Sequence, residues 1–260
     1  MNFNFFKKEP TIEFFSVIPE IAHLAPIQPL IKFKSNLIIN STKNLSQVKK
    51  KPEFEMQSNV HTAKCPGIIN KSKLGWVMTT WQDLVIETYG DGVKFTWESP
   101  VDQRQMKNGD LVGEMLSFHP EHQYSNFVET DSNTLKLVLK IQTPWRCIVP
   151  KGYYLHEGPL PYTDEKRFTT VEGFFSRESG VSNLNVQLLW HVPNGKTLIK
   201  AGTPIAHYML VPKNQPKLVV MEASEKQLKA YKLSLAEVSR KYISKKGETA
   251  CIFAKYFGDK

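Results

Sequence analysis

The segment at residues 133–150 alternates apolar and polar side chains, and this pattern constrains the fold more than any other feature of the chain. Its apolar residues recur at every second position: Leu135, Leu137, Leu139 and Ile141. Successive side chains of an extended strand point to opposite faces, so the alternation predicts a strand with one buried face. Segments 181–192 and 203–211 alternate in the same way. The chain is therefore predicted to be mainly β.

Glycine and proline mark the turns between these runs. A Gly-Asp-Gly sequence at 90–92 separates two runs rich in β-branched and aromatic residues, which predicts a β-hairpin. Pro-Lys-Gly at 150–152 and Gly-Thr-Pro at 202–204 lie between short apolar runs. Glycine permits a positive φ at a sharp bend and proline fixes its own φ. Such corners are typical of a compact barrel or clip.

The C-terminal part of the chain has a helical pattern instead. Ser224 and Gln227 have the spacing of a capping box. Apolar residues follow at three- and four-residue steps: Leu228, Tyr231, Leu235, Val238 and Tyr242. This spacing predicts one amphipathic helix with basic residues on its other face.

Together these patterns predict a β-clip or a jelly-roll-like barrel or sandwich with one C-terminal amphipathic helix. We expect three regions: an N-terminal arm and edge strand at 1–60 that packs on the core, a β core at 61–222, and a helix with a tail at 223–260.

The composition limits the compartment and the partners. The 260 residues carry a net charge of +9, which can attract nucleic acid or an anionic ligand but is also common on a solvated surface. The chain contains no run of eighteen apolar residues, so no membrane partner is expected. Three widely spaced cysteines argue against a disulfide framework and predict a cytoplasmic protein.

Residues 144–213 contain, in order, Pro-x-Gly-x-Tyr, Gly-Phe-Phe, Gly-Val and Ile-Lys-x-Gly-x-x-Ile-Ala. This order resembles the core of the trimeric dUTPases and dCTP deaminases, which have β-clip folds. The resemblance implies a β-clip topology, a nucleotide-like ligand, and a homotrimer with its sites at the subunit borders.

The chain departs from that family at the positions of its chemistry. The catalytic Asp of the family corresponds to Ser176, and a serine cannot act as the carboxylate base that orients the attacking water. The Arg and Gln of the closing corner correspond to Pro204 and His207. The resemblance therefore supports the topology and argues against the family's hydrolysis.

A second resemblance extends over more of the chain. The segments 12–29, 61–68, 145–162 and 201–213 resemble an uncharacterised family of marine tailed phages and bacteria. This resemblance implies a phage-encoded protein that works in the host cytoplasm, and it implies no activity.

The first functional hypothesis is a phage accessory protein that binds a small anionic or nucleotide-like ligand, with no evident catalysis. Its pocket is expected between the corners at 152–161, 172–180 and 202–207. The candidate ligand-binding residues supply charge, a hydroxyl group or a ring: Lys151, Tyr153, Arg167, Ser176, Arg177, Lys200 and His207.

Two alternatives stay open. A cupin-like barrel is suggested by the Pro-x-Gly element at 150–152 followed by His156. With His119 and His122, that histidine would hold a divalent metal, iron or zinc, in a metal-dependent enzyme. The other alternative is a structural protein of the virion, or one that interacts with the host, with an aromatic interface. Whether the protein is an enzyme is left undecided by the sequence.

Overall fold

The computed structural model describes residues 10–18, 20–33, 65–100, 115–126 and 130–242. The chain divides into two compact units. We call residues 1–35 and 72–214 the β unit. Residues 36–71 and 215–260 are the helical unit, because its described elements are the helices α4 (Pro66–Lys71) and α5 (Glu225–Tyr242).

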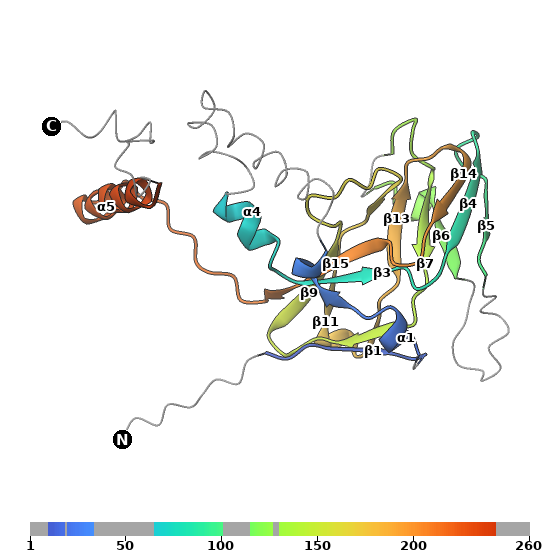
Figure 1. Cartoon of the computed structure of the whole chain (residues 1–260), viewed down its shortest axis with the longest axis horizontal. Coiled ribbons are helices and arrows are strands. Elements are labelled where there is room, and N and C mark those ends of the chain that lie inside the picture. Colours follow the sequence, from blue (N-terminus) through green and yellow to red (C-terminus); the bar gives the residue numbers. More distant parts are fainter. Residues whose placement is uncertain (1–9, 19, 34–64, 101–114, 127–129, 243–260) are drawn as a thin grey trace, which may run out of the picture. The chain divides into compact units, whose positions relative to one another are not determined.

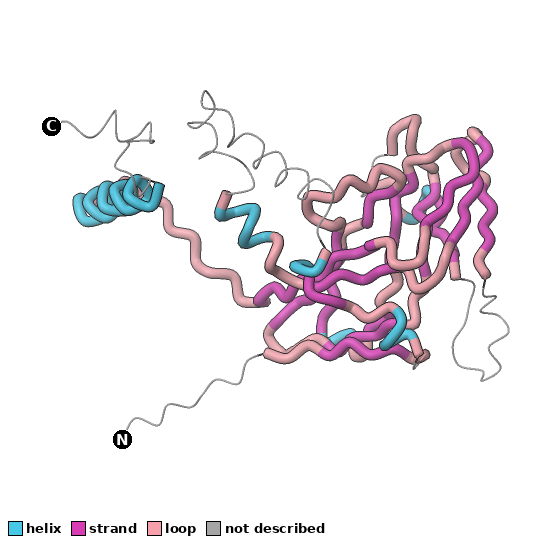
Figure 2. Tube along the Cα trace, in the orientation of Figure 1, coloured by secondary structure: helices cyan, strands magenta, loops and turns pink. Residues whose placement is uncertain are grey.

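The described part of the β unit contains four antiparallel sheets, so the predicted mainly β class is confirmed (Figures 1 and 2). The five-stranded sheet has the order β11 (Gly173–Ser176), β9 (Tyr153–Gly158), β15 (Pro204–Pro212), β3 (Trp76–Thr79) and β2 (Gln28–Pro29). The four-stranded sheet has the order β10 (Phe168–Thr170), β13 (Val186–Trp190), β7 (Leu137–Ile141) and β6 (Leu116–Pro120). As described, each sheet is open and none closes into a barrel.

Two smaller sheets complete the β unit. One has the order β14 (Asn194–Ile199), β4 (Leu84–Tyr89) and β5 (Phe95–Glu98), and the other has β1 (Glu13–Ser16), β8 (Trp145–Ile148) and β12 (Ser182–Asn183). Short helical turns join some strands: α1 (Ile21–Leu24), η1 (Leu30–Lys32), η5 (Glu121–Gln123) and η6 (Arg177–Ser179).

The predicted turns and the predicted helix are present. The Gly-Asp-Gly sequence connects β4 to β5, whose register pairs Thr88 with Phe95. Gly202 has a φ of +83°, as expected for the bend before β15. Helix α5 begins where Ser224 and Gln227 exchange hydrogen bonds, with 3.3 Å from Gln227 N to Ser224 Oγ and 2.8 Å from Ser224 N to Gln227 Oε1. None of the helices in the described residues is long and apolar enough to cross a membrane.

The expected regions and the two units have different boundaries. Strands β1 and β2 of the expected arm belong to the β unit, where β1 is an edge strand. The expected core begins at residue 61, whereas residues 36–71 group with the C-terminal region. Much of the expected arm, at 34–60, lies outside the described residues.

The alternating segments bury their apolar side chains between the sheets. In β13, Val186, Leu188 and Trp190 are buried, and the residues between them are half-buried. Trp190 stacks on Phe168 with 6.4 Å between the ring centroids. Burial of such side chains is the main favourable contribution to folding. It also fixes which residues of β13 face away from the core.

The connection before β3 packs tightly against β15. Gly75 has a φ of +84°, and the carbonyl of the preceding Leu74 lies 2.8 Å from Nε2 of His207. A Cβ atom on Gly75 would lie 2.1 Å from the carbonyl oxygen of Tyr208 and 2.7 Å from His207 Nε2. Only glycine therefore allows β15 to approach this connection so closely.

We expect Gly75→Ala to destabilise the protein by at least about 2 kcal/mol, because it adds left-handed strain and a backbone clash. For a chain of this size, that corresponds to a drop in Tm of roughly 5 °C or more in a thermal melt followed by circular dichroism. Gly173→Ala is the matched control, since its Cβ would meet no atom within 4 Å and its φ is not positive. Equal melting temperatures for Gly75→Ala and the wild type would contradict this view of the packing.

Candidate functional site

A polar pocket of about 390 Å³ lies where the chain passes from the four-stranded sheet to the five-stranded sheet. Thr170 in β10 pairs with Leu188 in β13, and Gly173 in β11 pairs with Glu157 in β9. Only Val171 and Glu172 connect the two strands, so the sheets diverge at this point. We call this cavity the amide pocket, and it is lined by Lys140, Glu157, Val171, Glu172, Gly173, Phe174, Phe175, Asn183, Asn185 and Gln187.

Three side-chain amides form a row along one wall of the amide pocket. Asn183, Asn185 and Gln187 alternate with buried residues, so all three face the same side of the extended chain. Lys140 stands directly opposite Gln187 in the register of β7 and β13 and shares this face. An amide offers both a donor and an acceptor, and a lysine adds a mobile positive charge.

Most of these polar groups have no partner within the described part of the chain. Asn185 Oδ1 accepts a hydrogen bond from the Thr143 amide at 3.2 Å, which leaves its NH2 group available. The side chains of Asn183, Gln187 and Lys140 make no hydrogen bond or ion pair to any described residue. Gln187 and Lys140 are half-buried and Asn183 is exposed, so water or a ligand can satisfy all three side chains.

A buried carboxyl group adds to this wall. Glu157 is 4% exposed and accepts a 2.5 Å hydrogen bond at Oε2 from the hydroxyl of Tyr208. Burial raises the pKa of Glu157 to about 7, and the Tyr208 hydrogen bond opposes that shift. Because Tyr208 engages Oε2, the other oxygen is available to a ligand. Near neutral pH the group can act as a hydrogen-bond donor or as an acceptor.

The side chains around Glu157 share its buried environment. Tyr208 is fully buried, and burial together with the nearby Glu157 raises its pKa well above the ordinary value. Burial raises the pKa of the Cys147 thiol to about 11, and the charge of Glu157 adds to this shift. Cys147 is therefore a protonated packing residue at neutral pH, as its position in an apolar strand predicts.

Gly173 keeps the amide pocket open. It pairs with Glu157 across β11 and β9, so a side chain here would point to the same face as Glu157. A Cβ atom at this position meets nothing within 4 Å. A larger side chain at residue 173 would therefore extend into the cavity without a backbone clash.

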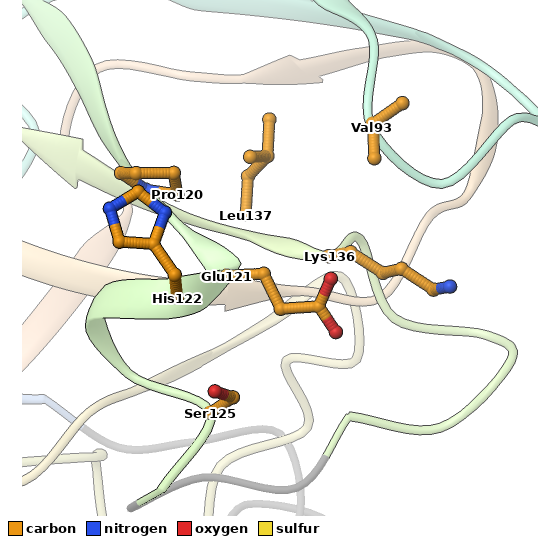
Figure 3. Close-up of a pocket in the computed structure, with 7 residues that line it drawn as sticks. All are labelled: Val93, Pro120, Glu121, His122, Ser125, Lys136 and Leu137. Carbon is orange, nitrogen blue, oxygen red and sulfur yellow. The ribbon is translucent and has the colours of Figure 1, made fainter.

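A second and larger pocket, of about 530 Å³, lies beside η5 and is shown in Figure 3. Its lining residues are Val93, Pro120, Glu121, His122, Ser125, Lys136 and Leu137. The side chains of Glu121 and Lys136 extend toward the same side of the view, and His122 turns the other way (Figure 3). No charged residue of this lining is buried. The amide pocket is the better candidate because a buried titratable group faces it.

The residues predicted to bind a ligand are spread over the β unit, and none of the seven lines the amide pocket. Lys151, Arg177 and Lys200 are exposed in turns, and Tyr153 packs against the core at the start of β9. Ser176 ends β11, and its hydroxyl oxygen is 3.5 Å from that of Ser179.

Two of the predicted residues already have protein partners. Arg167 forms a bidentate ion pair with Glu165, with 2.5 Å between Nη2 and Oε2, and its Nη1 donates to the carbonyl of Leu198. His207 is buried and bonded to Leu74. The predicted corners do contribute in another way, because Glu157 and residues 172–175 of the amide pocket belong to two of them.

The predicted metal ligands lie in different elements. His119 lies in β6 with Nδ1 2.8 Å from Gln123 Oε1, and His122 follows in η5. His156 is in β9, with Nε2 3.4 Å from Glu172 Oε2 and its ring against Phe174. Within the described residues, no group of three or more His, Cys, Asp or Glu side chains could hold a metal ion. The metal hypothesis remains a prediction.

Sequence reasoning did not select the residues of the amide pocket. One available signal was the Asn-x-Asn-x-Gln pattern at 183–187, which places three amides on one face of a predicted strand. Another was the acidic Glu157 at the end of an apolar run. Comparison of the chain with protein-family models and with curated proteins finds no match to either.

The raised pKa of Glu157 predicts how stability depends on pH. The stability linked to its protonated form is fully present below pH 4.5 and is lost as the pH rises through about 7. The difference between 4.5 and about 7 corresponds to roughly 3 kcal/mol. Glu157→Gln keeps an acceptor for Tyr208 and carries no charge. We therefore expect it to be more stable than the wild type at pH 8, by up to that amount, and similar to it at pH 4.5.

Urea unfolding at the two pH values measures this effect. Glu172→Gln is the control, because it removes an exposed carboxyl group from the same pocket and leaves Glu157 in place. A Glu157→Gln variant that loses stability between pH 4.5 and 8 as steeply as the wild type would show that Glu157 does not titrate in this range.

Proposed function

We propose that this protein binds a small, planar, nucleotide-like ligand in the amide pocket. The observation that supports this most is the row of Asn183, Asn185 and Gln187, whose donors and acceptors face one cavity beside the buried Glu157. Amide side chains recognise the mixed donor and acceptor edges of heterocyclic bases, as Asn and Gln do with adenine.

The other lining residues suit the remaining parts of such a ligand. Phe175 is half-buried and gives the pocket an apolar wall beside the polar row. Lys140 is the one basic residue in this lining, and it can meet a phosphate or another anionic group. Glu172 and Glu157 add acidic groups, so the base is expected to contribute more recognition than a multiply charged phosphate chain.

The resemblance to proteins of marine tailed phages extends this proposal to the source and the compartment of the protein. On this proposal it is a phage-encoded accessory protein that acts in the host cytoplasm. The ligand would come from the nucleotide pool of the infected cell.

Thermal shifts with nucleosides and nucleotides test this function. We expect at least one of adenosine, guanosine, cytidine, uridine or their phosphates to raise the Tm at 1 mM. A dissociation constant near 10 μM would stabilise the fold by about 2.7 kcal/mol. For a chain of this size, that amounts to roughly 5–10 °C.

Variants of the lining residues then test whether the ligand binds in the amide pocket. Gly173→Leu fills the cavity and Gln187→Leu removes one amide, so each should reduce the thermal shift by more than half. Gln142→Leu is the matched control, since this half-buried glutamine bonds to Ser117 and lies outside the lining. The proposal fails if no nucleoside or nucleotide shifts the Tm, or if Gly173→Leu leaves the shift unchanged.

A further inference from the structure

Arg146 of β8 is a half-buried arginine that forms no ion pair with any described residue. Its Nη1 donates to the backbone carbonyls of Thr143 and Trp145, each at 2.9 Å. These two bonds use both hydrogens of Nη1 and hold the guanidinium group in place. Nε and Nη2 make no hydrogen bond within the described chain, so three of the five N–H donors of this side chain remain for a ligand or for water.

Arg167 shows how the same chain completes a guanidinium group held in this way. Its Nη1 also donates to a backbone carbonyl, that of Leu198. Its Nε and Nη2 donate to the two carboxylate oxygens of Glu165, at 2.8 and 2.5 Å. The Nε and Nη2 donors of a guanidinium group match the two oxygens of a carboxylate or a phosphate. In Arg146 these same two donors have no oxyanion partner among the described residues.

The two arginines also differ in their electrostatic surroundings. The hydrogen bonds to Glu165 raise the pKa of Arg167, whereas burial lowers the pKa of Arg146. Partial removal of a cation from water is unfavourable when no counter-charge is near. A bound oxyanion would offset this penalty at Arg146, as Glu165 does at Arg167.

Arg146 lies beside the amide pocket. It stands directly opposite Asn183 in the register of β8 and β12, and residues directly opposite each other share one face of a sheet. Asn183 belongs to the lining of the pocket. Thr143 provides a second link, because its carbonyl accepts from Arg146 and its amide donates to Asn185 of the lining. Arg146 therefore extends the row of amides at its Asn183 end.

We propose that the Nε and Nη2 donors of Arg146 bind a phosphate group of the ligand in the amide pocket. This inference rests on the proposed function and names the ligand class as a nucleoside monophosphate. Lys140 stands at the other end of the row, opposite Gln187, but a lysine offers a point charge and not a planar pair of donors. Glu157 and Glu172 in the lining disfavour a longer and more negative phosphate chain.

Calorimetric titration of the full chain with adenosine, guanosine, cytidine, uridine and their 5′-monophosphates tests this inference. For the nucleoside that binds most tightly, we expect its monophosphate to bind at least about tenfold more tightly, since charge-assisted bidentate contacts are among the stronger hydrogen bonds. Arg146→Gln should remove this difference and change the affinity for the nucleoside less than threefold. Arg146→Lys keeps the charge without the planar pair of donors and should retain only part of the difference.

Arg177→Gln is the matched control, because it removes an exposed arginine of the β unit that lies outside the pocket lining. It should distinguish nucleoside from monophosphate as the wild type does. Thermal melts followed by circular dichroism check that each variant is folded.

Nuclear magnetic resonance of the arginine Nε–H groups gives a measurement on the wild type that does not depend on the folding of a variant at residue 146. Titration with inorganic phosphate at constant ionic strength should shift the Arg146 Nε–H signal saturably. The Arg167 Nε–H signal should stay in place, because Glu165 already binds that group. The signal of each arginine is assigned by its absence from the spectrum of the corresponding Arg→Lys variant.

Three results would overturn the inference: equal affinities of the wild type for nucleoside and monophosphate, equal losses in Arg146→Gln and Arg177→Gln, or an Arg146 Nε–H signal that inorganic phosphate leaves unmoved. The proposed function fails in a different way. If no nucleoside or nucleotide binds while inorganic phosphate shifts the Arg146 signal, base recognition is excluded and the phosphate site at Arg146 is supported.

Discussion

A carboxyl group removed from water costs several kcal/mol unless it is neutral or hydrogen-bonded. In this protein Glu157 of β9 is buried between β11 and β15, and among the described side chains its hydrogen-bond partner is the hydroxyl of Tyr208. That bond ties together the neighbouring strands β9 and β15 of the five-stranded sheet at the point where the sheet borders the amide pocket. The backbone carbonyl of Tyr208 in turn lies so close to Gly75 that a Cβ atom there would be 2.1 Å from its oxygen, so this part of β15 depends on the connection before β3.

The pocket follows from how the sheets separate. The chain leaves the four-stranded sheet at Thr170, the end of β10, and enters the five-stranded sheet at Gly173, the start of β11. The two residues that connect these strands are too few to fill the space between the diverging sheets. The apolar residues of β13 face the core, so its alternate residues must line that space. Their identity as Asn185 and Gln187, with Lys140 opposite, makes the space polar. The structure thus places unpartnered donors and acceptors beside a carboxyl group whose pKa is close to neutral.

Local sequence patterns were sufficient for much of the fold. The alternation at 181–192 predicts β13 and its buried face, and the Gly-Asp-Gly sequence predicts the β4–β5 hairpin. The alternation at 133–150 predicts one strand, whereas the structure divides this segment into β7 and β8 around Pro144, because proline cannot donate to a ladder. The open sheets and the grouping of 36–71 with the C-terminal region depend on long-range packing, which no local pattern encodes.

The site was much less predictable. Lys140, Glu157 and Gln187 are 17 to 47 residues apart, and only the pairing of β7 with β13 and the crossing between sheets bring them to one cavity. Sequence reasoning favoured basic residues near turns, such as Lys151 and Lys200, because charge and corners are visible locally. The structure leaves those side chains exposed.

The most direct test of the amide pocket is nuclear magnetic resonance of the side-chain amide groups during titration with nucleosides and nucleotides. The account predicts saturable shifts of the Asn183, Asn185 and Gln187 NH2 signals with one common dissociation constant, while the Gln142 signal stays in place. Saturable shifts confined to other parts of the β unit, with these three signals unmoved, would contradict it.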